Sequence, residues 1–436
     1  MAVTLISDNK IGLTIKAIID SPADYGLLPN NTYFKDLSDG LIYWKDGSGV
    51  VKGLFDGSAS GILGISNASG EYTYYSTLAA AEAAVAVDGV VEMFTNLATT
   101  TQHGFNKKYT LNGNGYAINN NAATGYALAT NNFIVINLTN LKVNCTGGAD
   151  GINAGGGASR INADDSVYVA VNAARALNIV SSATVVGGNY KNISSTEYAV
   201  VNTGGTLMNV NVSGYRGIDS IGGTVRNSFA TADFQAINLT SGAVGHKLLG
   251  YSNSGSGISA DTNAKTYSSE GISNIGVAII GQGGAIFEGC KGLSLGLYGW
   301  GGLPASNFQF LNDCTSHSLV SLGGQLKAYI SGGKFTSEGS RGLDLYGGSM
   351  EDVKVESKYN NAAGHAIYLA ASNLELIDCK FKVANAGANC IWSNATATNA
   401  YIADNKYRGG ATVDVEATIT NVQANPSDTY GNTKIG

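Results

Sequence analysis

The stretch "RGLDLYGGSMEDVKVES", residues 341–357, alternates apolar and polar residues, breaks at a Gly-Gly pair and then alternates again. Successive side chains of a strand point to opposite faces, so Leu343 and Leu345 share one face while Asp344 lies on the other. The two valines after the break share a face in the same way. A unit this small cannot bury its apolar face alone, so the pattern predicts that neighbouring units cover it.

The same unit returns along the chain at steps of about 18 to 25 residues, within the range of solenoid repeats. No leucine-rich frame holds, and the apolar period is two, which excludes helical repeats. Gly and Asn at the breaks tolerate positive φ and suit tight corners. The sequence therefore predicts an all-β fold, a right-handed parallel β-helix of roughly 13 coils, with a rod on the order of 60 Å long.

Composition excludes several classes of function. The net charge of −6 indicates no basic stripe and hence no nucleic-acid partner. No apolar run is long enough to cross a bilayer, which predicts no membrane insertion. The start "MAVTLISDNKIG" lacks the features of a signal peptide. The five cysteines are odd in number and form no CxxC motif, so we expect buried structural thiols, no metal and no cofactor.

The chain divides into parts of different character. "NTYFKDLSDGLIYWKDGSGVVKGLF" holds two Asp-Gly turns between apolar runs, which predicts hairpins. In "YYSTLAAAEAAVAVDGVVEMF", Ser76 is the expected cap of a short helix from Leu78 to Ala86 that covers the first coil. The predicted parts are a β-rich domain (1–56), a Gly/Ser-rich joint (57–71), the helix cap and first strands (72–120), the coils (121–410) and C-terminal strands with a tail (411–436).

This order of parts, a head with "TYFKDLSDGLIYWKDGSGVV", a helix-capped entry and then irregular coils, resembles bacteriophage tail fibres, tailspikes and related virion appendages of the pectate-lyase-like β-helix superfamily. The resemblance implies a homotrimer, a tail or head fibre, located in the virion and assembled in the host cytoplasm. It implies attachment to other virion proteins through the N-terminal domain, and a rod that presents itself to bacterial surface polysaccharide. Some members of this superfamily cut the glycan, whereas others only bind it.

Aromatic residues gather at outward positions of the last five coils. We align these coils on Gly296, Leu319, Gly342, Ala366 and Cys390, so that the second residue after each faces outward. Rings with a polar tip suit contact with sugars, and they suit a contact between subunits equally well. Both interpretations stay open at this point. The candidate glycan-binding residues are Tyr298, Trp300, Asp344, Tyr346, Tyr368 and Trp392.

Carboxylates are sparse beside these rings. Glycoside hydrolysis needs two carboxyl groups about 5 to 9.5 Å apart. Asp344 is a weak catalytic candidate, because Ser321 and Tyr368 are its expected neighbours in the column. Arg341 and His365 lie nearby at corners, where we expect them to be solvated. The sequence therefore favours a non-enzymatic fibre with no assigned catalytic residue, and the alternative is a depolymerase, a hydrolase or lyase, that cleaves host polysaccharide.

Overall fold

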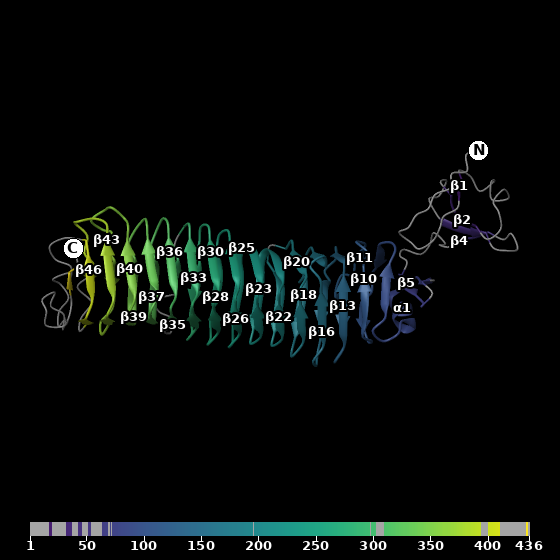
Figure 1. Ribbon diagram of the computed structural model, residues 1–436, viewed down its shortest axis with the longest axis horizontal. Helices are drawn as coiled ribbons and strands as arrows, with labels where there is room; N and C mark the ends of the chain where they lie inside the picture. The colour runs from purple at the N-terminus through teal and green to yellow at the C-terminus, as the bar shows by residue number, and fades with distance from the viewer. Residues whose placement is uncertain are drawn as a thin grey trace.

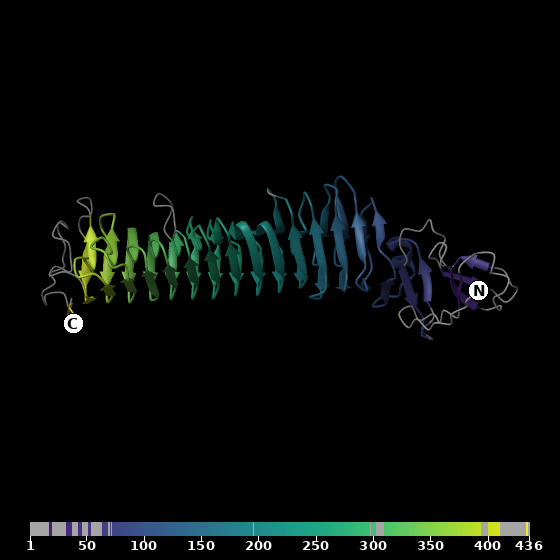
Figure 2. The same ribbon diagram turned by 90° about the horizontal axis from the view of Figure 1, so that it is seen from above.

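The computed structural model describes residues 63–409 apart from 69, 71, 195, 297, 302–308 and 394–399. Outside this range it gives the strands β1 (Ala17–Ile19), β2 (Thr32–Asp36), β3 (Ile42–Lys45), β4 (Val51–Gly53) and β47 (Thr433–Lys434). The fold is a parallel β-solenoid of about 14 turns, of the right-handed type, which confirms the predicted all-β β-helix. Figure 1 and Figure 2 show the turns stacked in a single row.

Each complete turn contributes strands to three parallel faces, which we name I, II and III in chain order. Face I contains β7 (Val90–Met93), β10 (Tyr109–Asn112), β13 (Val135–Thr139), β16 (Arg160–Ala163), β19 (Thr184–Val186), β22 (Thr206–Met208), β24 (Thr224–Arg226), β26 (Val244–His246), β29 (Lys265–Tyr267), β32 (Ile286–Glu288), β35 (Gln309–Asn312), the second parts of β37 (Gly324–Ser331) and β39 (Leu343–Glu351), β42 (Glu375–Ile377) and β45 (Tyr401–Ala403).

Face II contains β8 (Leu97–Thr99), β11 (Ala117–Asn120), β14 (Lys142–Cys145), β17 (Tyr168–Val171), β20 (Asn189–Asn192), the first parts of β23 (Asn211–Ile221) and β25 (Phe229–Thr240), β27 (Leu249–Ser252), β30 (Glu270–Ser273), β33 (Lys291–Ser294), β36 (Thr315–Ser318), β38 (Lys334–Ser337), β40 (Lys354–Ser357), β43 (Lys380–Val383) and β46 (Lys406–Arg408). β47 pairs with β46 at its end.

Face III contains β9 (His103–Phe105), β12 (Tyr126–Thr130), β15 (Asp150–Ala154), β18 (Leu177–Val180), β21 (Tyr198–Thr203), the second parts of β23 and β25, β28 (Ser256–Ala260), β31 (Ile279–Gly281), β34 (Trp300–Gly301), the first parts of β37 and β39, β41 (Ile367–Leu369) and β44 (Ile391–Ser393). Every strand pairs with its counterpart in the next turn. Ile152 pairs with Leu177, for example, and Leu177 with Val200.

The corner from face I to face II has one conformation in turn after turn. A residue with positive φ turns the chain, and the next residue points into the core, as Cys290, Cys314, Val353 and Cys379 do with no exposed surface. Gly, Asn and Asp are favoured at such positions because they adopt left-handed backbone at low cost. The corner residues are Asn140, Gly187, Asn209, Asn227, Lys247, Ser268, Gly289, Asp313, Gly332, Asp352, Asp378 and Asp404.

The interior is a continuous stack of aliphatic and aromatic side chains. Leu343, Leu345, Val353 and Val355 are all buried, as the alternation in residues 341–357 predicts. All five cysteines are buried and free, which confirms their predicted role as small core residues. Since every turn exposes apolar surface above and below, each turn depends on its neighbours for burial.

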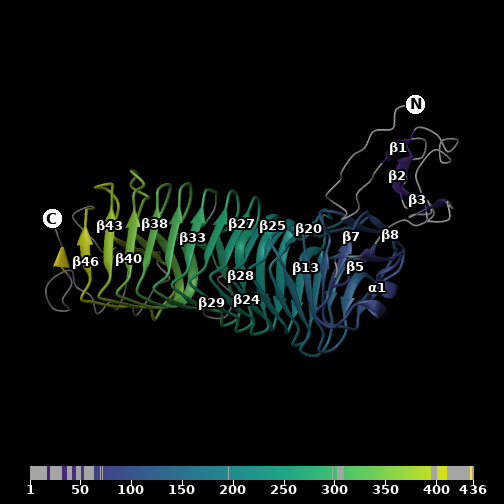
Figure 3. The same ribbon diagram turned by 45° about the vertical axis from the view of Figure 1, so that its right-hand side comes forward.

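A short helix covers the first turns. α1 (Leu78–Ala84) contacts β5 (Leu63–Ser66), β6 (Tyr72–Tyr75) and β9, and Figure 3 shows it at the N-terminal end of the row. The predicted cap and end were wrong by one and two residues. Thr77 is extended and its Oγ1 accepts from the Ala80 N–H at 3.2 Å. Lys107 Nζ donates to three carbonyls at the helix end, those of residues 82, 83 and 85. These bonds satisfy carbonyl groups that another turn of helix would otherwise have bonded.

The predicted N-terminal hairpins agree with the strand pairing. β2 pairs antiparallel with β3, and β3 with β4, in a separate four-stranded sheet that includes β1. Most of the predicted joint and tail, 57–71 and 411–436, lies outside the described residues. No helix within the described ranges is long and apolar enough to span a bilayer.

The left-handed corner can be tested at Gly289, where φ is +60° and an added Cβ meets nothing closer than 3.8 Å. Gly289→Ala is therefore expected to lower the free energy of unfolding by about 1 kcal/mol through backbone strain alone. Gly104 has similar space, 3.8 Å to the nearest atom, without a positive φ. Gly104→Ala is the matched control and should leave the denaturant midpoint unchanged or raise it. Equal midpoints for the two variants would contradict the corner argument.

Candidate functional site

Two of the candidate residues do not lie where the sequence alignment placed them. Trp300 pairs with Ile279 before it and with Gly324 after it, so it occupies the inward position of face III. Its side chain has no exposed surface, its ring meets Phe287 edge-on at 4.9 Å, and its Nε1 donates to Gln309 at 3.3 Å. The prediction that Trp300 faces outward was wrong.

The misplacement has a physical cause. Leu297 and Val320, which follow the anchors Gly296 and Leu319, looked like core positions because they are apolar. The core positions of those turns are Trp300 and Gly324. The large ring of Trp300 fills the interior beside Gly324, which has no side chain of its own in the next turn. The outward column therefore contains Gly301 and Gln325 in place of Tyr298 and Ser321. Tyr298 is half-buried at the corner before β34.

Asp344, in contrast, occupies the predicted outward column, between Gln325 and Tyr368. It is nevertheless only 2% exposed, because Arg341 folds over it. Arg341 Nε and Nη2 donate to the two carboxylate oxygens at 2.7 Å each. Burial raises the pKa of Asp344, and the hydrogen bonds and charge of Arg341 oppose that rise. Both carboxylate oxygens are thus engaged within the chain.

The remaining candidates build a stack around the same arginine, which we name the Arg341 cluster (Arg341, Asp344, His365, Tyr368 and Trp392). The Arg341 guanidinium lies 4.9 Å from the Tyr368 ring centre and 5.8 Å from that of Trp392. Tyr368 and Trp392 are 4.7 Å apart, and His365 stacks on Trp392 at 4.8 Å. The ring faces therefore contact one another, so less of each face is available to a sugar than the sequence suggested.

Tyr346 and His365 complete the surroundings of the cluster. Tyr346 Oη accepts from Gln325 Nε2 at 3.0 Å. His365 is 9% exposed rather than solvated as expected, and its Nδ1 accepts from the Asn389 N–H at 3.0 Å. Burial, followed by the Arg341 charge, lowers the pKa of His365 to about 4. The imidazole is therefore neutral at pH 7, and sequence reasoning missed its part in the stack.

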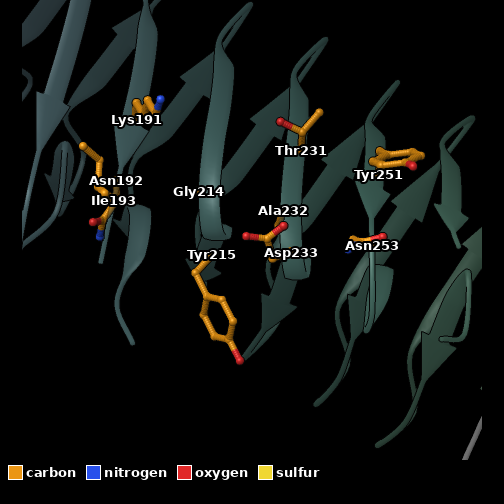
Figure 4. A pocket seen from close by; sticks show the side chains of 10 residues that line it. All are labelled: Lys191, Asn192, Ile193, Gly214, Tyr215, Thr231, Ala232, Asp233, Tyr251 and Asn253. Atoms are coloured by element: carbon orange, nitrogen blue, oxygen red, sulfur yellow. The ribbon is translucent and has the colours of Figure 1, made fainter. Parts of the chain in front are cut away.

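A second surface, the corner groove, was not anticipated. It is a cavity of about 560 Å³ along the edge between faces II and III. β23 and β25 run straight through this edge, whereas in the flanking turns the strand ends at Asn192 and at Ser252 and the next strand begins only at Tyr198 and at Ser256. Figure 4 shows the side chains that line the groove at this edge. The lining residues are Lys191, Asn192, Ile193, Gly214, Tyr215, Thr231, Ala232, Asp233, Tyr251 and Asn253.

The corner groove combines rings, amides and one charge of each sign. Lys191 and Asp233 are exposed, and neither side chain makes an ion pair with any residue in the described part of the chain. Tyr215 stacks on Phe234 at 5.9 Å, and Arg216 lies 5.5 Å from the centre of that Phe234 ring. Hydroxyl-rich ligands use this mixture of an apolar ring and convergent polar groups.

The acidic groups of these two surfaces stand singly in the described part of the chain. Within the described residues, no group of three or more His, Cys, Asp and Glu side chains has the arrangement of a metal site. The carboxylate in the aromatic column is held by Arg341, and the corner groove contains a single carboxylate, Asp233. A carboxylate pair of the kind that hydrolases use is absent from both surfaces.

Comparison with protein-family models, with curated proteins and with solved structures finds no match for this chain. The fold and the two surfaces are therefore the basis for any functional argument.

The Asp344–Arg341 pair should stabilise the fold. Asp344→Asn removes the buried charge that Arg341 binds, and we expect a loss of about 2 kcal/mol in the free energy of unfolding. Asp233→Asn, at an exposed carboxylate, is the control and should change it by less than about 0.5 kcal/mol. Chemical denaturation of both variants at pH 7 measures the difference. Equal effects would show that the pair is not structural.

His365 predicts a dependence of stability on acid. Its pKa is lowered in the folded chain, so the unfolded chain takes up the proton first, and stability that is present above about pH 6.5 is lost as the pH falls toward 4. His365→Phe keeps a ring on Trp392 and removes the titration. The difference in melting temperature between pH 7 and pH 4.5 should be smaller in the variant than in the wild type. An unchanged difference would rule out a contribution from His365.

Proposed function

We propose that this protein is a structural appendage of a bacteriophage virion, a homotrimeric fibre or tailspike that adheres to a bacterial surface glycan. One observation supports it most: an extended parallel β-solenoid of about 14 turns, with a polar groove on its outside, follows a small separate β-sheet near the N-terminus. In this proposal the N-terminal part attaches to other virion proteins and the rod presents the groove.

The corner groove is the glycan site that we favour within this proposal. It is open and spans four successive turns, from β20 to β27, so a linear chain of sugars fits along it. Tyr215 and Tyr251 offer rings, while Lys191, Asp233 and Asn253 offer donors and acceptors for hydroxyl groups. The Arg341 cluster is the second candidate, but its rings already contact one another.

Adhesion is favoured over cleavage because of the carboxylates. Asp344 gives both oxygens to Arg341, and Asp233 has no second carboxylate beside it in the corner groove. A depolymerase, the alternative, needs two. Two subunits together can supply two carboxylates, so the experiment measures cleavage directly.

The test uses the purified full chain and a panel of immobilised bacterial capsular polysaccharides and lipopolysaccharide O-chains. We expect binding to at least one of them without new reducing ends or unsaturated products. Lys191→Ala combined with Asp233→Ala should weaken that binding at least tenfold, because both polar ends of the groove are lost. The matched control is Lys142→Ala with Asp165→Ala, two exposed residues outside the groove.

Three results would contradict the proposal in different ways. Release of oligosaccharides would make the protein a depolymerase. If Lys191→Ala with Asp233→Ala leaves binding unchanged, the glycan site lies elsewhere on the rod. A monomeric mass by light scattering would remove the homotrimer.

A further inference from the structure

Two columns of opposite charge run side by side along the C-terminal half of the rod. The I–II corner carries Asp352, Asp378 and Asp404 in three successive turns. Two residues after each, the first position of face II is a lysine. We name the aspartates the acidic column and the lysines Lys354, Lys380 and Lys406 the basic column. Lys334 extends the basic column by one turn. Lys291 and Asp313 lie on the same lines, each separated by one uncharged turn, at Thr315 and Gly332.

This pattern corrects an expectation from composition. The net charge of −6 predicted no basic stripe, yet Lys334, Lys354, Lys380 and Lys406 pair directly across four successive turns. Like charges directly opposite each other on neighbouring strands destabilise a sheet. The sequence signal is the motif Asp-x-Lys, which recurs at 352–354, 378–380 and 404–406.

The two columns do not neutralise each other within the chain. Neither the three aspartates of the acidic column nor Lys354, Lys380 and Lys406 form an ion pair or a side-chain hydrogen bond with a residue in the described ranges. Lys334 of the basic column pairs with Glu356 at 3.1 Å. Lys382 and Lys358, which lie outside the column, pair with Glu356 at 2.7 Å and with Glu338 at 2.8 Å. The acidic column and most of the basic column are therefore available to a partner.

The side-by-side arrangement of the acidic and basic columns favours a second copy of the chain that runs parallel to the first. When a second copy runs parallel and is related by rotation about an axis along the rod, its basic column faces the acidic column of the first copy. When the second copy runs antiparallel, related by a twofold axis across the rod, acid faces acid and base faces base. Because each aspartate and its lysine belong to one turn, a parallel partner also meets them at matching heights.

Apolar surface that an interface needs lies next to the acidic column. On face I, Phe310 and Tyr329 stack at 5.4 Å and are 46% and 44% exposed. They line a depression of about 300 Å³ together with Glu288 and Glu351. Aromatic residues supply affinity at interfaces, whereas rows of charge mainly supply specificity and register.

We infer that this corner is the contact between copies of the chain, and that the acidic and basic columns hold the copies parallel and in register. The inference rests on the proposed homotrimer and names the surface that forms it. A linear polyanion is the rival occupant of the basic column, but the acidic column beside it would repel such a ligand.

The test reverses the charges of one column at a time. The basic-column variant carries Lys354→Glu, Lys380→Glu and Lys406→Glu, and Glu270 already occupies this column in an earlier turn. The acidic-column variant carries Asp352→Lys, Asp378→Lys and Asp404→Lys, and Lys247 already adopts φ +51° at the equivalent corner. The exchange variant carries all six changes. The control carries Lys108→Glu and Glu197→Lys, two exposed residues at other corners, between β9 and β10 and between β20 and β21.

Light scattering after size exclusion gives the mass of each variant, and circular dichroism confirms that each is folded. We expect each single-column variant to dissociate at concentrations at least tenfold above those at which the wild type does. The exchange variant and the control should keep the wild-type mass. High salt should weaken the wild-type assembly, since the columns are exposed.

The masses of the wild type and of the variants distinguish a failure of this inference from a failure of the proposed homotrimer. A wild-type oligomer that both single-column variants retain would overturn the inference and leave the homotrimer intact. A monomeric wild type would overturn both, and binding of dextran sulfate to that monomer, lost in the basic-column variant, would assign the basic column to a polyanion instead.

Discussion

The structure depends on one backbone constraint, the left-handed residue that turns each coil from face I to face II. This residue has positive φ in nearly every turn, from Asn140 to Asp404. The residue after it then points inward, and the following strand begins in register with the turn before. A shift of one residue at this corner would send the apolar residues of face II outward. The corner thus fixes both the core and the outward columns, and every surface discussed above is a consequence of that register.

Fixed register makes the outside of the rod a set of straight columns, whose chemistry changes from turn to turn. On face III the column passes through Asp219 and Asn238, which are hydrogen-bonded, and later through Asp344 and Tyr368. Where the edge loops are absent, at β23 and β25, the columns border a groove instead. A solenoid therefore gains binding surfaces by changing single residues or single loops, while the core stays the same.

The sequence was sufficient to predict the solenoid, the covering helix and the buried cysteines, because period-two alternation and corner residues are local signals. It also predicted the column around Asp344 and Tyr368. It failed at Trp300, since Leu297 offered an equally apolar position and only packing against Phe287 and Gly324 decides between them. It missed the stack on Arg341 because His365 and Trp392 are brought together by the register of neighbouring turns. The corner groove depends on loop length across four turns, which alternation does not encode.

The five buried free cysteines offer a way to measure local unfolding of the rod in solution. They are spread from Cys145 to Cys390, and burial raises the pKa of Cys145 and of Cys379 to about 12. A thiol in that state does not react with alkylating reagents until its own coil opens. The rate at which each cysteine is alkylated therefore reports how often its stretch of the rod unfolds locally. Mass spectrometry of the labelled peptides would show whether unfolding starts at an end of the rod or in the middle.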